Sequence, residues 1–206
     1  MDVTLTLSTL GPVTPAPHVT ALLLTGGASS RLGRPKAALE VEGGPLAARV
    51  ARVLSDVCPL VLEVGPGYSG CESVLEDPAG EGPLGALAAG WAALSERGFE
   101  GAALAVACDL PQLSVAMVRL IAEWPTPGSV VPVVAGRAQP LFARWSGEAL
   151  AATISLRAAG ERSLRGLLAL PDVTRIDESD WGGVATALAF ADVDTPEDAR
   201  RLGLAL

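Results

Sequence analysis

Apolar residues in this chain fall into short continuous runs more often than into alternating patterns. Residues 19–24 and 102–107 are apolar almost throughout, which is typical of strands that helices cover on both faces of a sheet. Residues 47–54 instead carry apolar side chains at helical spacing, and a further strand follows at 60–64, so helices and strands alternate. The pattern predicts an α/β fold of three αβα layers around a mostly parallel sheet.

Turn and capping residues set the expected bounds of the remaining elements. Residues 130–144 are expected to form two strands that are joined by a turn at Gly136, and shorter strands are expected at 73–75 and 189–191. Helices are predicted at residues 80–95, with Pro83 in the first turn; at 114–123, capped by Ser114; after 160–164, capped by Ser163; and after Thr195, with Pro196 at the first position.

The length and the apolar content bound the number of domains. The chain has 206 residues and is 50% apolar, which suffices to bury one full core. We therefore expect a single domain at residues 19–206, preceded by a mobile leader at residues 1–18 that is rich in Pro and Thr. The only histidine, His18, lies in this leader and is expected to be solvated and idle, so that histidine does not act as a general base.

The charge and the cysteine spacing exclude several classes of protein. A net charge of −8 disfavours a nucleic-acid groove, because an acidic protein repels a polyanion at long range. No apolar run approaches the roughly eighteen residues of a spanning helix and the start has no basic segment, so neither membrane nor export is indicated and we expect a cytoplasmic protein. Cys58, Cys71 and Cys108 lack C-x-x-C spacing and are predicted to be apolar fillers rather than zinc ligands or disulfides.

A glycine-rich basic loop follows the first predicted strand. Its sequence from Gly26 to Lys36 reads G-G-x-x-x-R-x-G-x-x-K, in which Arg31 is the arginine and Gly33 the third glycine. Glycine lets the backbone approach a ligand closely, and free N–H groups in such a loop bind phosphate. Neither the P-loop nor the dinucleotide G-x-G-x-x-G pattern is present. The loop predicts a nucleotide ligand; the alternative is a flexible basic turn on an ordinary α/β domain.

Acidic residues stand at two further positions where a ligand is expected. Asp109 follows directly on the predicted strand at 102–107, and carboxyl ends of strands are where ligands gather in open α/β sheets. A carboxylate there is suited to Mg²⁺; the alternative, capping the helix at 114–123, is better served by Ser114. Asp192 and Asp194 alternate on an extended segment, so both project from the same face, and helix capping explains neither.

The predicted hairpin at 130–144 carries three polar side chains. Arg137, Gln139 and Arg144 are placed either to face an anionic acceptor or to solubilise an exposed hairpin edge, and the residues alone leave both readings open.

Taken in order, these motifs resemble the molybdenum cofactor guanylyltransferase (MobA-like) family. The resemblance extends from about residue 19 to about residue 202 and implies the glycosyltransferase-A-like, Rossmann-like nucleotidyltransferase fold. The motifs that carry it are Leu24-Thr25-Gly26-Gly27 with Arg31 and Lys36, Leu75-Glu76-Asp77 with Gly82-Pro83-Leu84, Cys108-Asp109-Leu110-Pro111, Gly136-Arg137 with Gln139-Pro140-Leu141-Phe142, and Asp192-Val193-Asp194-Thr195-Pro196-Glu197-Asp198.

The resemblance implies transfer of GMP from GTP to the terminal phosphate of molybdopterin, with Mg²⁺ and with release of pyrophosphate. The acceptor phosphate is itself the nucleophile, so catalysis would consist of alignment and charge neutralisation. The implied roles are guanine and ribose binding by Leu24, Thr25, Gly26 and Gly27, nucleoside contact by Asp77, phosphate binding by Lys36 and Arg31, and metal binding by Asp109 and Asp194.

Some positions depart from the family pattern and define the alternatives. Thr25 stands where Ala is common, Val64-Gly65 where many relatives have an Asn near the nucleotide, and Asp192 and Asp194 where Asn is frequent in the guanylyl branch. An acidic pair also occurs in the cytidylyl branch, whereas Gly26-Gly27 favours guanine. The alternatives are a cytidylyltransferase on the same pterin, a transferase for another small phosphate acceptor, and a catalytically silent nucleotide-binding regulator. Expected partners are small molecules, with transient docking to proteins that handle the cofactor.

Overall fold

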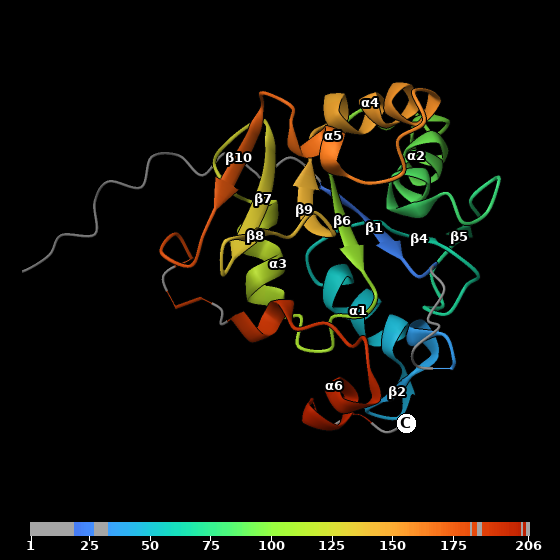
Figure 1. Cartoon of the computed structure of the whole chain (residues 1–206), viewed down its shortest axis with the longest axis vertical. Coiled ribbons are helices and arrows are strands. Elements are labelled where there is room, and N and C mark those ends of the chain that lie inside the picture. The colour runs from blue at the N-terminus through green and yellow to red at the C-terminus, as the bar shows by residue number, and fades with distance from the viewer. Residues whose placement is uncertain (1–18, 27–32, 182, 185–186, 203, 205–206) are drawn as a thin grey trace, which may run out of the picture.

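A mixed sheet of eight strands forms the centre of the molecule (Figure 1). The computed structural model describes residues 19–26, 33–181, 183–184, 187–202 and 204, so the predicted leader at 1–18 lies outside the described residues. The sheet has the order β10-β7-β9-β6-β1-β4-β5, and β8 pairs with β7. Its strands are β1 (Thr20–Leu24), β4 (Val61–Val64), β5 (Ser73–Val74), β6 (Ala103–Ala107), β7 (Ser129–Val134), β8 (Arg137–Ala138), β9 (Phe142–Trp145) and β10 (Val173–Ile176).

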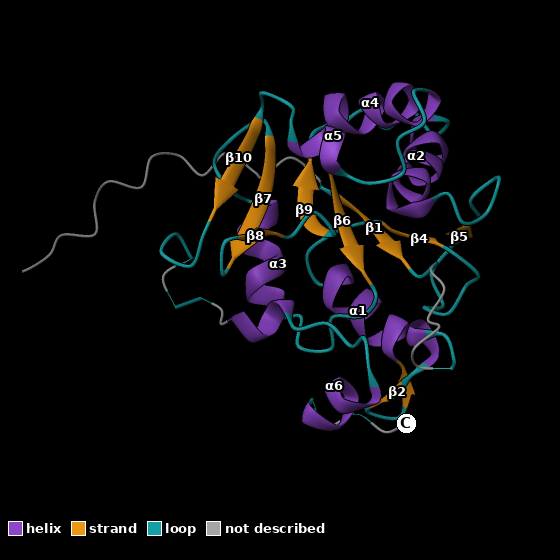
Figure 2. Cartoon of the chain, viewed as in Figure 1, coloured by secondary structure: helices purple, strands orange, loops and turns teal. Residues whose placement is uncertain are grey.

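Helices cover both faces of this sheet (Figure 2). One apolar cluster packs α1 and α3 on one face, and a second packs α2, α4 and α5 on the other, which confirms the predicted three layers. The remaining elements are α1 (Leu46–Ser55), α2 (Gly82–Ser95), α3 (Val115–Ala122), α4 (Gly147–Ala158), α5 (Arg165–Leu168), α6 (Pro196–Arg201), the 3-10 helices η1 (Lys36–Ala38) and η2 (Ala187–Phe190), and a small hairpin of β2 (Glu40–Val41) and β3 (Gly44–Pro45).

The sheet is mostly parallel, as the apolar runs predict. β1 pairs in parallel with β4 and with β6, and β10 pairs in parallel with β7. β9 runs antiparallel between β6 and β7. Gly90 brings α2 close to this sheet, because a Cβ there would lie 2.8 Å from a methyl group of Leu22.

Local capping signals predict the helix starts well. The Ser114 side chain accepts a hydrogen bond from the Met117 N–H at 3.3 Å, which confirms the predicted cap of α3. Thr195 and Asp198 form a reciprocal capping box with Pro196 in the first turn of α6. α5 has buried Leu164 at its N-cap, one residue after the predicted Ser163, although Ser163 Oγ accepts a hydrogen bond from the Arg165 N–H at 3.4 Å.

The strand predicted at 189–191 is absent, and residues 187–190 form η2 instead. The apolar character of this segment serves packing: the Phe190 ring lies 5.2 Å from that of Phe142 and 5.5 Å from that of Trp181, centroid to centroid. These aromatic contacts bury Phe190 without any pairing of its backbone in the sheet.

The cysteines match the prediction of apolar fillers. Cys58 and Cys108 are buried, and burial raises the pKa of each thiol to about 12. Both are therefore neutral at physiological pH and pack as small apolar groups. Within the described part of the chain, no helix combines the length and the apolar character needed to cross a bilayer.

Arg144 corrects the expectation of a solvent-facing or acceptor-facing arginine. Its side chain is buried, with 3% of the residue exposed, and it points away from the hairpin edge. Nη1 donates to the carbonyl oxygens of Ala122 and Trp124 at 2.8 and 3.0 Å, and Nη2 donates to those of Thr126 and Gly128. Arg144 therefore holds the segment that follows α3 by its carbonyl groups.

We expect Arg144→Met to lower the free energy of unfolding by about 3 kcal/mol or more, because buried carbonyl oxygens would lose charged donors. Chemical denaturation of the purified protein measures this change. Arg137→Met is the matched control, since Arg137 is exposed on the neighbouring strand β8. Equal stability of the two variants would contradict the role of Arg144 in holding the segment after α3.

Candidate functional site

The carboxyl ends of three parallel strands meet at one edge of the sheet. Leu24 of β1 is in register with Val64 of β4 and with Ala107 of β6. The chain passes from β1 to β4 and β5 on one side and then returns to β6 on the other. Such a reversal creates a crevice at the carboxyl ends of the strands, where ligands bind in open α/β sheets. The glycine-rich loop leaves β1 at this point.

Three predicted site residues come together beside this crevice. Lys36 at the start of η1 donates from Nζ to Asp109 Oδ2 at 2.8 Å and also to Asp194 Oδ1. The side chains of Lys36 and Asp109 are 20% and 19% exposed, and that of Asp194 is 44% exposed. The Val193 N–H donates to the Asp109 carbonyl oxygen at 3.1 Å. The segment before α6 is thereby fixed against the loop after β6.

The charges in this cluster act on one another. Burial by itself lowers the pKa of Lys36, but hydrogen bonds and negative charge from Asp109 and then Asp194 outweigh it, and the net shift is upward. Lys36 is therefore firmly cationic. Desolvation raises the pKa of Asp192, and the negative charges of Asp194 and then Asp109 raise it further. Asp192 is therefore a third carboxylate that interacts electrostatically with the cluster.

The donor set of the cluster fits Mg²⁺ in its chemistry. Within the described residues, no group of three or more His, Cys, Asp or Glu side chains has the geometry of a metal site. Asp109 and Asp194 nevertheless share one lysine, so their oxygens are neighbours. Mg²⁺ commonly takes one or two protein carboxylates and completes its octahedron with phosphate oxygens and water.

The other predicted binding residues are distributed around the crevice. Leu24 and Thr25 are 7% and 6% exposed, and the Leu24 carbonyl oxygen accepts a hydrogen bond from the Cys108 N–H at 3.0 Å. Gly26 is exposed at the edge. Gly27 and Arg31 lie outside the described residues, so their predicted roles stay predictions.

Asp77 lies on an exposed loop whose backbone is hydrogen-bonded to the 157–162 region. Arg157 Nη2 donates to the Asp77 carbonyl oxygen at 2.8 Å and pairs through Nε with Glu81 at the start of α2. Arg162 Nη2 lies 3.2 Å from Glu81 Oε1. The backbone at Asp77 is thus fixed while its side chain faces solvent, where it is accessible to a ligand.

A cavity of about 210 Å³ adjoins Asp109 on the β6 and β9 side. Its wall combines aromatic and aliphatic groups with the carboxylates of Asp109 and Asp192. Of the three polar residues predicted on the hairpin, Gln139 contributes to the lining, whereas Arg144 is buried elsewhere. The full lining is Ala107, Asp109, Leu110, Gln139, Pro140, Leu141, Phe142, Phe190 and Asp192.

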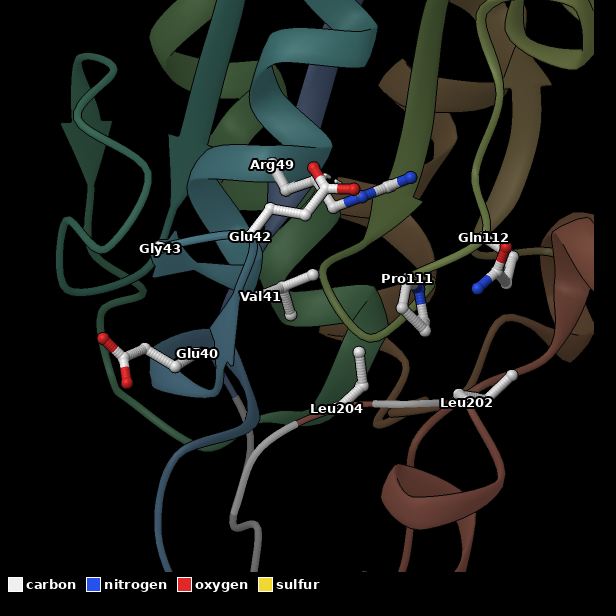
Figure 3. Close-up of a pocket in the computed structure, with 9 residues that line it drawn as sticks. All are labelled: Glu40, Val41, Glu42, Gly43, Arg49, Pro111, Gln112, Leu202 and Leu204. Carbon is white, nitrogen blue, oxygen red and sulfur yellow. Dashed lines mark ion pairs between the residues drawn. The ribbon is translucent and has the colours of Figure 1, made fainter.

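A larger cavity of about 400 Å³ lies apart from the charged cluster, between the β2–β3 region, the loop after β6 and the segment after α6 (Figure 3). Arg49 faces Glu42 across its upper wall, with Nε 3.8 Å from Oε2. Lys36, Asp109 and Asp194 do not line it. The smaller cavity is lined by Asp109 of the cluster and by Asp192, and it is therefore the better candidate for a ligand site.

Sequence reasoning missed one charged residue at this edge of the sheet. Glu63 lies in β4, is fully buried, and bonds to Thr25 and to the loop that follows β4. The signal for it was present, because a glutamate inside an apolar strand must find buried partners.

The comparisons with known proteins agree with this geometry. The model of the MobA-like NTP transferase domain matches residues 21–178, well over half of the chain. The chain belongs to the MobA-like NTP transferase family. A protein of this family is a nucleotidyltransferase.

Relatives of this MobA-like transferase carry the name "Probable molybdenum cofactor guanylyltransferase". The protein from Pelotomaculum thermopropionicum is 32% identical over 188 residues, which cover 88% of this chain and 90% of the relative. The protein from Synechococcus elongatus is 38% identical over 106 residues, which cover 47% of this chain and 53% of the relative. The match thus spans about half the length of the Synechococcus protein.

A solved structure shares the fold of this MobA-like transferase. The molybdopterin-guanine dinucleotide biosynthesis protein A from Archaeoglobus fulgidus superposes with a TM-score of 0.74 at 19% identity, covering 89% of this chain and 96% of that chain. The predicted glycosyltransferase-A-like α/β fold is confirmed.

Proposed function

We propose that the protein transfers GMP from GTP to the terminal phosphate of molybdopterin and releases pyrophosphate. The observation that carries this proposal is the cluster of Lys36, Asp109 and Asp194 at the crevice between β1 and β6. A lysine held between two carboxylates, one of which follows a strand, is suited to a triphosphate and its metal ion. The names of the relatives support guanine as the base and the pterin phosphate as the acceptor.

The reaction needs alignment of the reactants and neutralisation of charge. An oxygen of the acceptor phosphate attacks the α-phosphorus of GTP, and a new P–O bond forms there. The bond from that phosphorus to the oxygen bridging to the β-phosphate breaks, and this oxygen leaves with pyrophosphate. Lys36 stabilises the negative charge on the phosphates, and no side chain has to supply a nucleophile.

Asp109 and Asp194 would hold Mg²⁺. When bound, the ion neutralises charge on the triphosphate. The carboxylates also keep Lys36 cationic and fixed at the start of η1, so that the lysine is oriented before the nucleotide arrives. This pre-organisation is the part of catalysis that the chain itself supplies.

The cavity of about 210 Å³ beside Asp109 is our proposed acceptor site. Pro140 and Leu141 are partly exposed apolar groups that can pack against a planar ring, and Gln139 offers an amide for its polar edge. This wall lies on the β6 and β9 side of the crevice, leaving the β1 and β4 side to the nucleoside.

The acidic pair of Asp192 and Asp194 supports a second candidate, a cytidylyltransferase on the same pterin.

We expect pyrophosphate release from GTP, with Mg²⁺ and molybdopterin, to exceed release from CTP, ATP or UTP by at least tenfold. A coupled pyrophosphate assay with each nucleotide separately measures this, and omission of molybdopterin is the control. A preference for CTP would select the second candidate, and no release from any nucleotide would contradict the proposed reaction.

A further inference from the structure

A buried carboxylate lies beside the end of β1, and the proposed chemistry does not use it. Glu63 is fully buried in β4. Its Oε1 accepts hydrogen bonds from Thr25 Oγ1 at 2.5 Å, from Gly67 N at 2.8 Å and from Tyr68 N at 2.9 Å. Its Oε2 accepts from Ser69 N at 2.7 Å and from Ser69 Oγ at 2.5 Å. Both oxygens are occupied, so Glu63 does not itself bind a ligand.

The donors keep Glu63 charged in spite of its burial. Burial by itself raises the pKa of this carboxyl, but hydrogen bonds from the side chains of Ser69 and Thr25 and from the backbone of Ser69 and Tyr68 outweigh it, so the pKa lies below its ordinary value. An ionised carboxylate with several donors holds its partners strongly and in fixed directions. Four of the bonds order the loop after β4, and the fifth reaches across to the end of β1.

Thr25 and Gly65 interlock at the point where this fifth bond is made. Gly65 has φ +149°, and a Cβ added there would lie 2.0 Å from Thr25 Oγ1 and 3.1 Å from Gly26 N. The Thr25 side chain therefore occupies the space of a side chain at position 65. The Thr25 N–H also donates to the Val64 carbonyl oxygen at 3.1 Å, so both its backbone and its side chain are fixed.

We propose that Glu63 is a positioning residue that sets nucleotide affinity and base preference through Thr25. By holding the threonine hydroxyl and the loop at 65–69 together, it fixes the backbone of Thr25 and Gly26 as a rigid wall for the nucleoside half of the substrate. Lys36 and Asp109 lie on the opposite side of β1, toward β6. Loss of Glu63 therefore acts on nucleotide binding and leaves the reacting groups in place.

This inference rests on the proposed nucleotidyl transfer and is tested with the full chain. We expect Glu63→Gln to raise the KM for the preferred nucleotide about tenfold and to reduce its preference over other nucleotides, with kcat changed less than threefold. Thr25→Val, which removes the hydroxyl, is expected to raise KM and to reduce the nucleotide preference in the same way. Thr25→Ser keeps the hydroxyl and should retain the wild-type preference. Ser55→Ala, which removes a hydroxyl bonded within α1, is the control.

A double-mutant cycle of Glu63→Gln and Thr25→Val separates positioning from general destabilisation. Non-additive effects on KM support action through Thr25, and additive effects overturn it, as does an unchanged KM and preference in a folded Glu63→Gln protein. If Glu63→Gln does not fold, the contrast between Thr25→Val and Thr25→Ser decides, and equal behaviour of these two overturns the inference. Calorimetric titration with GTP and CTP, without acceptor, separates failure of this inference from failure of the proposed reaction. A wild-type protein that binds nucleotide without turnover contradicts only the proposed reaction.

Discussion

Asp109→Asn is expected to lower turnover of the proposed reaction by about 100- to 1000-fold, the range observed when one preorganised electrostatic group is removed from an active site. Asparagine has nearly the same shape but carries no charge, so the variant loses both the proposed ligand to Mg²⁺ and the partner of Lys36. The measurement is the steady-state rate of pyrophosphate release with saturating GTP and molybdopterin. Thermal unfolding of the same preparation shows whether the fold is intact.

Asp56→Asn is the matched control for this experiment. Asp56 is the exposed C-cap residue of α1, so the same substitution there changes the net charge equally without touching the crevice. We expect the control to keep full activity. Activity of Asp109→Asn within twofold of the control would remove Asp109 from the site.

The layers of the fold were predictable because their signals are local. Strands β1 and β6 sit between helices on both faces and are apolar almost throughout, so their sequences alone indicate buried parallel strands. Ser114 and Thr195 cap their helices within a few residues of their own positions. Such information is contained in short windows of sequence and needs no knowledge of distant contacts.

The composition of the charged cluster was predictable, but its geometry was not. Asp109 stands out as a carboxylate at a strand end and Lys36 as the last residue of the glycine-rich pattern. Asp194 joins them from a segment 158 residues away from Lys36. Only the assembled sheet shows that one lysine bridges both carboxylates, because no local pattern encodes that contact.

Charged residues inside strands were hard to interpret from the sequence. Arg144 was expected to face solvent or an anionic acceptor, and no role was predicted for Glu63. Both are buried, because the segment after α3 turns carbonyl groups toward Arg144 and the loop after β4 turns N–H groups toward Glu63. All the partners of Arg144 and most of those of Glu63 are backbone groups, which every sequence possesses, so residue identity could not reveal them.

Lys36→Met is expected to weaken GTP binding roughly 10- to 150-fold, because a charge-assisted hydrogen bond is worth about 1.5–3 kcal/mol. The rate should fall as well, since the charge that develops on the departing pyrophosphate loses its cation. Calorimetric titration with GTP and single-turnover kinetics measure the two effects separately. Methionine retains most of the side-chain volume, so the effects report the ammonium group rather than packing.

Comparison with Lys36→Arg tests whether the cluster needs a compact cation. The planar guanidinium keeps the charge but presents its donors in a wider fork than an ammonium group does, and the two carboxylates bonded to Lys36 Nζ are fixed by different segments. We therefore expect arginine to restore part of the GTP affinity but less of the rate. Arg119→Met, which removes an exposed cation from the last turn of α3, should change neither quantity. If Lys36→Met binds and reacts as this control does, the cluster stabilises the fold alone and the phosphates are held elsewhere.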